Sequence, residues 1–460
     1  MLRHVIVILG MAAAAAAQTS TPVPTDAEIH RILVERIDAL RQSVGIVVGV
    51  IEPSGRRVVS YGRLAKDEAR TPDGDTVFEI GSITKVFTSL LLADAVQRGE
   101  VSLADPVSKY LPASVKMAER GRAITLQDLA THTSGLPRLP ANMKPRDAAN
   151  PYADYSVEQL YQFLSSYQPA RDAGAQYEYS NLGGGLLGHV LAERAQTDYA
   201  SLVRARVTAP LGMTSTSIVL SPEQKARLAA GHSATLEPVP NWDLPTLAGA
   251  GALRSSTNDL LTFLAANLGY TTSPLGRAMA SMLDVRRPTG VDNLQIALGW
   301  HVLRAHGRDI VWHNGGTAGY RTFIGFDPAA RSGVVVLSNA GTAAGPDDIG
   351  RHLLDPQLPL VAAAAPAVHS EIPIDARLYE RYAGRYQFAP SAVLTITRTD
   401  AHLFAQLTGQ PAFEIFPESE TRFFLKVVDA QLTFEPDAAG TTAAVVLHQN
   451  GRDQRATRIE

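Results

Sequence analysis

The sequence predicts an α+β fold, in which an antiparallel sheet is flanked by helices with a helical subdomain, followed by a small C-terminal all-β barrel. Strand-like runs occur early in the chain and return between residues 296 and 338, and a helix-rich stretch separates them. This order is typical of α+β proteins rather than of repeating βαβ units. Short alternating runs then follow a segment rich in alanine and proline, which indicates a separate β domain.

The first residues have the layout of a secretory signal peptide. Arg3 and His4 precede an apolar run over residues 5–17, and three alanines before Gln18 form a small-residue cleavage site. Because the run is too short for a membrane span, we predict a signal peptide over 1–17 and a tether over 18–27. The expected location is periplasmic or secreted, with no membrane span after cleavage. An uncleaved N-terminal anchor is the alternative.

Hydrophobic periodicity predicts the elements of a first domain over residues 28–355. This domain is expected to begin with an amphipathic helix over 28–40, followed by a hairpin of strands at 44–51 and 58–61. A buried helix from Ser82 to Gly99 leads into a helical region over 100–290. The later elements are strands at 296–303, 310–313, 321–326 and 333–338, and a helix at 347–354.

A linker is predicted over residues 356–374 from its alanine and proline content, and a second domain over 375–460. Strand-like runs in this domain recur about every ten residues, which is typical of a small barrel or sandwich. They lie at 393–398, 403–407, 413–416, 422–427, 431–434 and 443–448. The domain carries no catalytic pattern, so we expect a stabilising or docking module rather than one that gates substrate.

Composition excludes several function classes. The formal net charge of −3 and the lack of a basic run argue against nucleic-acid binding. The absence of cysteine excludes disulfides, thiol catalysis and most zinc sites. We therefore expect small molecules or peptides as partners, and neither a cofactor nor a metal.

The most informative pattern is a serine followed three positions later by a lysine, Ser82 and Lys85, at the start of an apolar run. Positions i and i+3 share a helix face, so the Lys85 amine can take the proton of the Ser82 hydroxyl. No other lysine of the chain has a serine three positions before it. The alternative is that Ser82 is an ordinary helix N-cap and Lys85 a solvated residue of the first turn.

Two further patterns supply a second proton-handling group and a glycine-rich strand end. They are Tyr179-Ser180-Asn181 and Trp312-His313-Asn314-Gly315-Gly316. The order Ser-x-x-Lys, Tyr-x-Asn, His-x-Gly matches the three sequence boxes of β-lactamases and penicillin-binding proteins.

Ser256-Thr257-Asn258 is a rival for the second box, but it runs directly into an apolar stretch and is better explained as a helix cap.

With these boxes the chain resembles the β-lactamase-related serine hydrolases, the superfamily of class C β-lactamases and serine DD-carboxypeptidases. The resemblance covers about residues 28–355 and extends to the stretches 129–137, 210–213 and 315–320. The second and third boxes are more similar to secreted DD-carboxypeptidases. Residues 382–386 resemble the start of the lipocalin-like domain that follows many of these hydrolases.

The resemblance implies an acyl-enzyme mechanism through Ser82, with Lys85 and Tyr179 as the other catalytic residues. It implies substrate contacts for Asn181, His313, Asn314, Gly315 and Gly316. Burial would lower the pKa of Lys85 so that its neutral amine acts as base. The backbone N–H groups of Ser82 and Gly316 are the expected oxyanion donors.

The third box departs from a β-lactamase, which has lysine followed by threonine or serine where this chain has His313 and Asn314. A charge there would depend on protonation of the imidazole, and Arg321 is a weaker candidate for the missing cation. This departure weakens the case for efficient β-lactam hydrolysis. From the three boxes together, we expect hydrolysis of β-lactam or D-Ala-D-Ala amide bonds. Two alternatives stay open: a carboxylesterase or D-amidase, and a slowly acylated penicillin sensor without turnover.

Overall fold

The computed structural model describes residues 23–361, 369–389, 392–399, 402–408, 410–428, 430–437, 440–449 and 452–460. The predicted signal peptide and the first half of the predicted tether lie outside these residues. Within the described ranges, no helix is both long and apolar enough to cross a bilayer.

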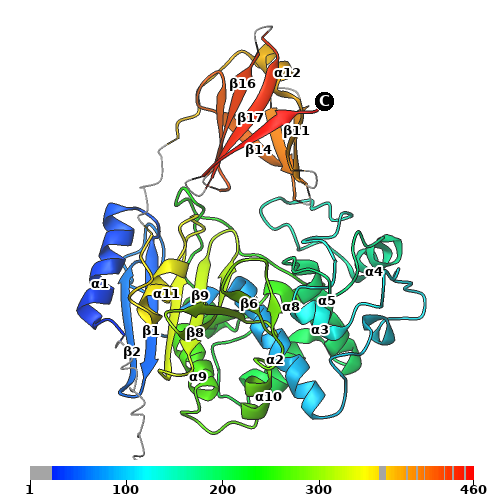
Figure 1. The fold of residues 1–460 in the computed structure, drawn as a ribbon. Helices are drawn as coiled ribbons and strands as arrows, with labels where there is room; N and C mark the ends of the chain where they lie inside the picture. Colours follow the sequence, from blue (N-terminus) through cyan, green and yellow to red (C-terminus); the bar gives the residue numbers. More distant parts are fainter. Residues whose placement is uncertain are drawn as a thin grey trace, which may run out of the picture.

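An antiparallel sheet of eight strands forms the centre of the first domain (Figure 1). Its order is β2-β1-β10-β9-β8-β7-β6-β5, so the N-terminal hairpin pairs with the last strand of the domain. The strands are β1 (Gly45–Glu52), β2 (Gly55–Gly62), β5 (Arg287–Pro288), β6 (Leu294–Ile296), β7 (His301–Ala305), β8 (Arg308–Gly316), β9 (Arg321–Asp327) and β10 (Ser332–Ser338). The predicted α+β class is confirmed.

Helices cover both faces of this sheet because its central strands are apolar on both sides. Val48 of β1 and Val336 of β10 pack in one cluster with α1 (Asp26–Val34) and α11 (Asp347–Leu354). Val47 and Val335, their neighbours in sequence, pack on the opposite face against the helical part of the domain. The alternation follows the period of two in a β-strand.

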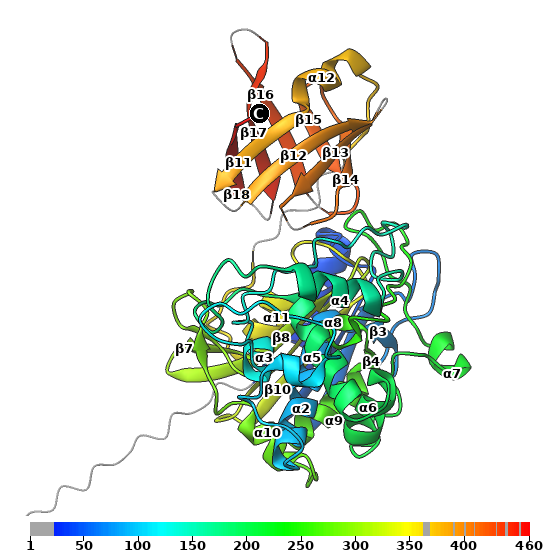
Figure 2. The same cartoon turned by 90° about the vertical axis from the view of Figure 1, so that its right-hand side faces the viewer.

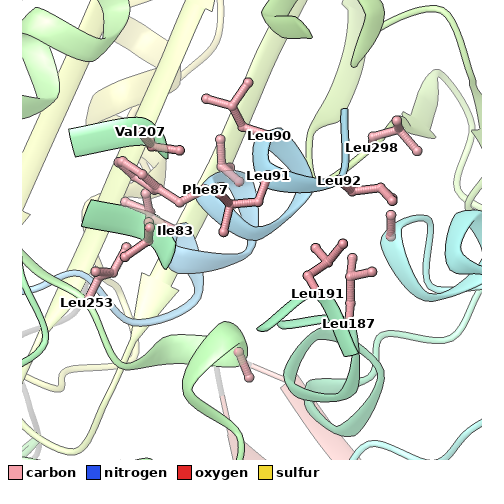
Figure 3. Close-up of a cluster of buried hydrophobic side chains, with 14 of the residues drawn as sticks. Ile83, Phe87, Leu90, Leu91, Leu92, Leu187, Leu191, Val207, Leu253 and Leu298 are labelled. Carbon is pink, nitrogen blue, oxygen red and sulfur yellow. The ribbon is translucent and has the colours of Figure 1, made fainter. Parts of the chain in front are cut away.

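The helical part is built around α2 (Thr84–Gln97), which is buried along most of its length. Figure 3 shows its apolar side chains packed against Leu187 and Leu191 of α5. The surrounding helices are α3 (Leu126–Ala130), α4 (Val157–Ser166), α5 (Asn181–Arg194), α6 (Tyr199–Val203), α7 (Pro222–Ala226), α8 (Ala248–Gly251), α9 (Thr257–Asn267) and α10 (Gly276–Ser281). Strands β3 (Val77–Glu79) and β4 (Arg254–Ser256) form a second, small sheet.

Local geometry corrects three of the predicted elements. The run 296–303 is not one strand: Gly299 has φ +71°, and the Ala297 N–H donates to the Trp300 carbonyl at 2.7 Å, so the chain turns between β6 and β7. The helix expected from Ser82 begins as a 3₁₀ turn, η2 (Gly81–Ile83), and becomes α-helical at Thr84. The predicted helix over 28–40 is α1 followed by a π-helical turn, η1 (Glu35–Ala39).

The second domain is a closed antiparallel barrel of eight strands, which Figure 2 shows as a body of its own. It contains β11 (Gly384–Ala389), β12 (Ala392–Thr399), β13 (His402–Leu407), β14 (Phe413–Pro417), β15 (Arg422–Leu425), β16 (Ala430–Pro436), β17 (Thr442–Gln449) and β18 (Arg452–Arg458), preceded by α12 (Tyr379–Tyr382). Aromatic side chains, among them Tyr386, Phe423 and Phe434, fill its interior. The predicted barrel is confirmed.

Both described ends of the predicted linker contact the domain next to them. The Val361 N–H donates to the Asp348 carboxylate of α11 at 2.7 Å. On the far side, the Ile372 N–H donates to the Pro417 carbonyl of β14 at 2.9 Å, and the Lys426 amine lies 2.7 Å from the Glu371 carboxylate. These contacts fix the direction in which the chain leaves one domain and enters the other.

Candidate active site

Ser82 and Lys85 lie where the small 3₁₀ turn enters α2, and the structure brings their functional atoms together. The Lys85 Nζ lies 3.0 Å from the Ser82 Oγ, 2.9 Å from the Asn181 Oδ1 and 2.7 Å from the Ala250 carbonyl oxygen. Ser82 is half-buried, so solvent and substrate can reach it, whereas Lys85 is buried. The N-cap alternative for Ser82 does not hold, since its hydroxyl faces the lysine and no side chain caps α2.

Burial lowers the pKa of Lys85 well below its ordinary value of 10.5, and the nearby Arg138 charge lowers it further. A neutral amine has two N–H donors and one lone pair. The amine can therefore donate to Asn181 and to Ala250 while its lone pair accepts the Ser82 hydroxyl proton. The three measured contacts fit a neutral lysine that acts as base toward Ser82.

The second box places Tyr179 and Asn181 at the start of α5. Ser180 is the N-cap: its hydroxyl accepts from the Gly183 N–H at 2.8 Å and donates to the Pro137 carbonyl at 2.7 Å. Burial raises the pKa of the Tyr179 phenol, and the nearby Ser82 hydroxyl partly opposes this rise. The tyrosine therefore keeps its proton at neutral pH and can donate it.

Glycines of α5 let the helix come close to the lysine, a feature that was not predicted from the sequence. A Cβ on Gly184 would lie 2.9 Å from the Lys85 Cε, and a Cβ on Gly188 would lie 2.8 Å from the Gly249 Cα. These contacts are too close for any larger residue without rearrangement. The run Gly183-Gly184-Gly185 inside a helical pattern was the available signal, since glycine there is unfavourable unless close packing requires it.

The third box ends β8, and its close approach to the turn that carries Ser82 requires a glycine on each side. A Cβ on Gly315 would lie 2.0 Å from the Ile80 carbonyl oxygen. A Cβ on Gly81, which has φ +49°, would lie 2.6 Å from the Gly316 nitrogen. The backbone of Gly316 thus lies beside the residue that precedes Ser82, as expected if the N–H groups of Ser82 and Gly316 bind one oxyanion.

His313 faces the site but is not suited to carry a charge. Its ring centroid lies 6.3 Å from that of Tyr179, and its Nδ1 lies 2.6 Å from the Asn314 carbonyl oxygen. The side chain is fully buried, and its Nε2 has no hydrogen-bond partner in the described structure. Burial lowers the pKa of His313 well below 6.5. At neutral pH this burial disfavours the charged imidazolium that a carboxylate contact by His313 would need.

Asn314 and Arg321 do not supply the missing group either. The Asn314 amide donates to the Asp347 carboxylate of α11, on the other face of β8 from His313. The Arg321 guanidinium donates to the backbone carbonyls of Thr317 and Tyr320, at 2.6 and 3.0 Å. Neither side chain is held ready for a substrate carboxylate.

His313 belongs to a group of three buried histidines around Tyr179. The ring centroid of His132 lies 4.4 Å from that of Tyr179, and that of His301 lies 5.3 Å from that of His313. Desolvation lowers the pKa of His132 well below 6.5 and that of His301 to about 4. All three imidazoles are therefore neutral at pH 7.

We expect these histidines to make the protein acid-sensitive. The unfolded chain binds protons at histidine near pH 6.5 but the folded chain does not, so the unfolding free energy falls as pH drops below 6.5. Three protons give the unfolding free energy a slope of up to about 4 kcal/mol per pH unit below pH 6.5. Above pH 6.5 these histidines give it no slope. Urea unfolding at pH 7.5, 6.0 and 5.0 measures the slope. His301→Gln should reduce it by about one proton, and an identical slope in this variant would contradict the assignment.

The rival box is a structural cap. The Ser256 hydroxyl accepts from the Asp259 N–H at 3.3 Å and begins α9, as the sequence predicts. Among the described residues, no cluster of histidine, aspartate and glutamate side chains could hold a metal ion.

Comparison with known proteins agrees with this geometry. The family model described as Beta-lactamase matches residues 33–357, and a domain of unknown function, DUF3471, matches residues 368–458. The D-alanyl-D-alanine-carboxypeptidase/endopeptidase AmpH of Escherichia coli K12 is 31% identical over 313 residues, which are 64% of this chain and 79% of the relative. Penicillin-binding protein 4* of Bacillus subtilis is 28% identical over 430 residues, covering 87% of this chain and 92% of the relative.

A solved structure shows the same architecture. The Beta-lactamase/D-alanine Carboxypeptidase from Yersinia pestis, complexed with citrate, has a TM-score of 0.62 and 26% sequence identity, covering 73% of this chain and 97% of that one. The family model matches most of the chain, and both the shared fold and the three boxes are consistent with that match. The chain belongs to the beta-lactamase family of serine hydrolases.

Proposed function

We propose that this protein is an exported serine hydrolase that forms an acyl-enzyme through Ser82 and hydrolyses β-lactam or D-Ala-D-Ala amide bonds. The observation that carries the proposal is the contact of the Lys85 amine with the Ser82 hydroxyl, the Asn181 amide and the Ala250 carbonyl, in a site where burial lowers the pKa of that amine. The family membership and the relative AmpH support a D-alanyl peptide or a β-lactam as substrate.

In the acylation step, Lys85 takes the hydroxyl proton as the Ser82 oxygen attacks the substrate carbonyl. The oxyanion that forms lies between the N–H groups of Ser82 and Gly316. Collapse of this intermediate breaks the bond to the leaving nitrogen, which takes a proton from Tyr179, and Lys85 returns a proton to Tyr179. The products of the step are the serine ester and the free amine.

In the deacylation step, a water molecule attacks the ester carbonyl in the same oxyanion site. Tyr179 and Lys85 accept the water proton and pass it to the Ser82 oxygen as the ester bond breaks. Asn181 holds one end of this relay, since its Oδ1 accepts from the lysine and its Nδ2 donates to the Tyr152 hydroxyl at 3.2 Å. The carboxylic acid product leaves and the resting site is restored.

A carboxylesterase or D-amidase using the same Ser82 is the second candidate. The buried, neutral His313 and the backbone-bonded Arg321 favour it, because neither side chain offers a cation to the carboxylate of a β-lactam. An ester needs no such cation.

Side-by-side turnover of nitrocefin, a short-chain 4-nitrophenyl ester and a D-Ala-D-Ala peptide separates the candidates. Amide hydrolysis predicts that nitrocefin or the peptide has a higher kcat/KM than the ester, together with a penicillin adduct mapped to Ser82 by mass spectrometry. A kcat/KM that is highest for the ester, with no measurable turnover of the amides, would replace the first candidate by the second. N-terminal sequencing of the protein from the periplasm or medium tests export.

A further inference from the structure

An arginine that the three boxes do not include lies at the site. Arg138 follows the turn that ends at Pro137, and its guanidinium carbon lies 5.3 Å from the centroid of the Tyr179 ring. Its backbone carbonyl accepts from the N–H groups of Asn181 and Leu182, at 3.0 and 3.1 Å. The main chain of Arg138 is therefore fixed to the first turn of α5, which also carries Asn181.

The Arg138 guanidinium is exposed, and within the described part of the chain it has neither a hydrogen bond nor an ion pair. Other arginines of this region are engaged: Arg122 pairs with Asp128, and Arg171 pairs with Glu178. An exposed arginine left unpaired beside a reactive serine is available to a ligand.

The charge of Arg138 reaches the reacting groups. It lowers the pKa of Lys85 and of His132, and it opposes the rise in the pKa of Tyr179. Burial lowers the pKa of Lys85 and of the three histidines, so each of these groups is less readily charged than Arg138. Arg138 therefore adds a positive charge at the site.

We propose that Arg138 recognises a carboxylate on the acyl part of the substrate, the part that becomes esterified to Ser82. Its backbone is bonded to Asn181, whose side-chain amide is the candidate contact for the acyl amide of the substrate. The planar fork of a guanidinium matches a carboxylate with two parallel hydrogen bonds. This inference rests on the proposed acyl transfer through Ser82.

The test compares two esters that share a leaving group and an acyl length, 4-nitrophenyl hydrogen adipate and 4-nitrophenyl hexanoate. We expect Arg138→Gln to lower kcat/KM for the adipate at least about tenfold and to change that for the hexanoate less than about threefold. Arg138→Lys should retain part of the preference, because it keeps the charge but loses the fork. Added salt should reduce the wild-type preference for the adipate.

The matched control is Arg277→Gln, which removes an exposed arginine of α10 and makes the same change in net charge. This variant should keep the wild-type ratio of the two esters. An unchanged ratio of kcat/KM for the two esters in Arg138→Gln would overturn the inference. An equal loss of kcat/KM with both esters would also overturn it, because Arg138 would then act by positioning Tyr179 rather than by binding a carboxylate. If Ser82→Ala still hydrolyses both esters, the proposed function fails instead.

Discussion

Replacing Ser82 with alanine is expected to abolish covalent labelling and to lower kcat/KM by about 10,000-fold or more, because the attacking oxygen is removed and nothing else in the relay replaces it. Ser82 is half-buried and its hydroxyl is hydrogen-bonded to Lys85; alanine removes only this hydroxyl, so the substitution leaves no large cavity. Labelled penicillin and a fluorophosphonate, read by intact-protein mass, measure the adduct. Thermal unfolding shows that the variant is folded.

Ser256→Ala is the matched control for this substitution. It removes the serine of the rival Ser-Thr-Asn pattern, which caps α9, so it should cost about 1 kcal/mol of stability and leave labelling intact. A labelled Ser82→Ala protein, or loss of labelling in Ser256→Ala while it remains folded, would show that the nucleophile has been misassigned.

Lys85→Met is expected to lower kcat/KM between about 100-fold and 10,000-fold for every substrate class, which is the range that a positioned base contributes. Methionine is unbranched and of similar length but has no amine. Asn181 Oδ1 and the Ala250 carbonyl lose a donor, while the cost of burying the amine disappears. Stopped-flow measurement of acylation isolates the affected step, and thermal unfolding measures the net change in stability.

The pH dependence distinguishes a base from a merely structural lysine. Because burial lowers the pKa of Lys85, wild-type acylation should rise as pH increases through that lowered pKa and then level off well below pH 10.5. Lys85→Met should lose this rise of the acylation rate with pH. Lys225→Met, an exposed lysine of α7, should behave as wild type. Acylation by Lys85→Met within about tenfold of wild type would exclude the lysine as base.

Much of the architecture could be predicted because it depends on local periodicity. The apolar runs of β1 and β10 and the amphipathic pattern of α1 are visible in the sequence, as is the cap at Ser256. The turn at Gly299 was missed because the apolar residues on either side continue the strand pattern across it. Glycine alone did not mark the turn there.

Sequence spacing could place Ser82 beside Lys85, but it could not give the electrostatics of the candidate site. The spacing of Ser82 and Lys85 shows that they share a face, whereas the neutral state of His313 depends on burial by side chains far away in sequence. Asn314 was expected to contact substrate, but its amide is held by Asp347. Arg138 belongs to none of the three boxes and becomes noticeable only when the fold places it beside Tyr179.

The pairing of β1 with β10 determines when this domain can fold. Ile46 lies opposite Ser338, so the centre of the sheet joins segments separated by almost the whole first domain. Contacts of such long range are slow to form, because the loop they close must be ordered before they contribute any stability. Until residues up to about 338 are available, β1 has no partner on the edge that β10 occupies in the folded domain. A chain that stops before residue 316 also lacks the strand end that lies beside Gly81, so we expect such a chain to have no complete candidate site.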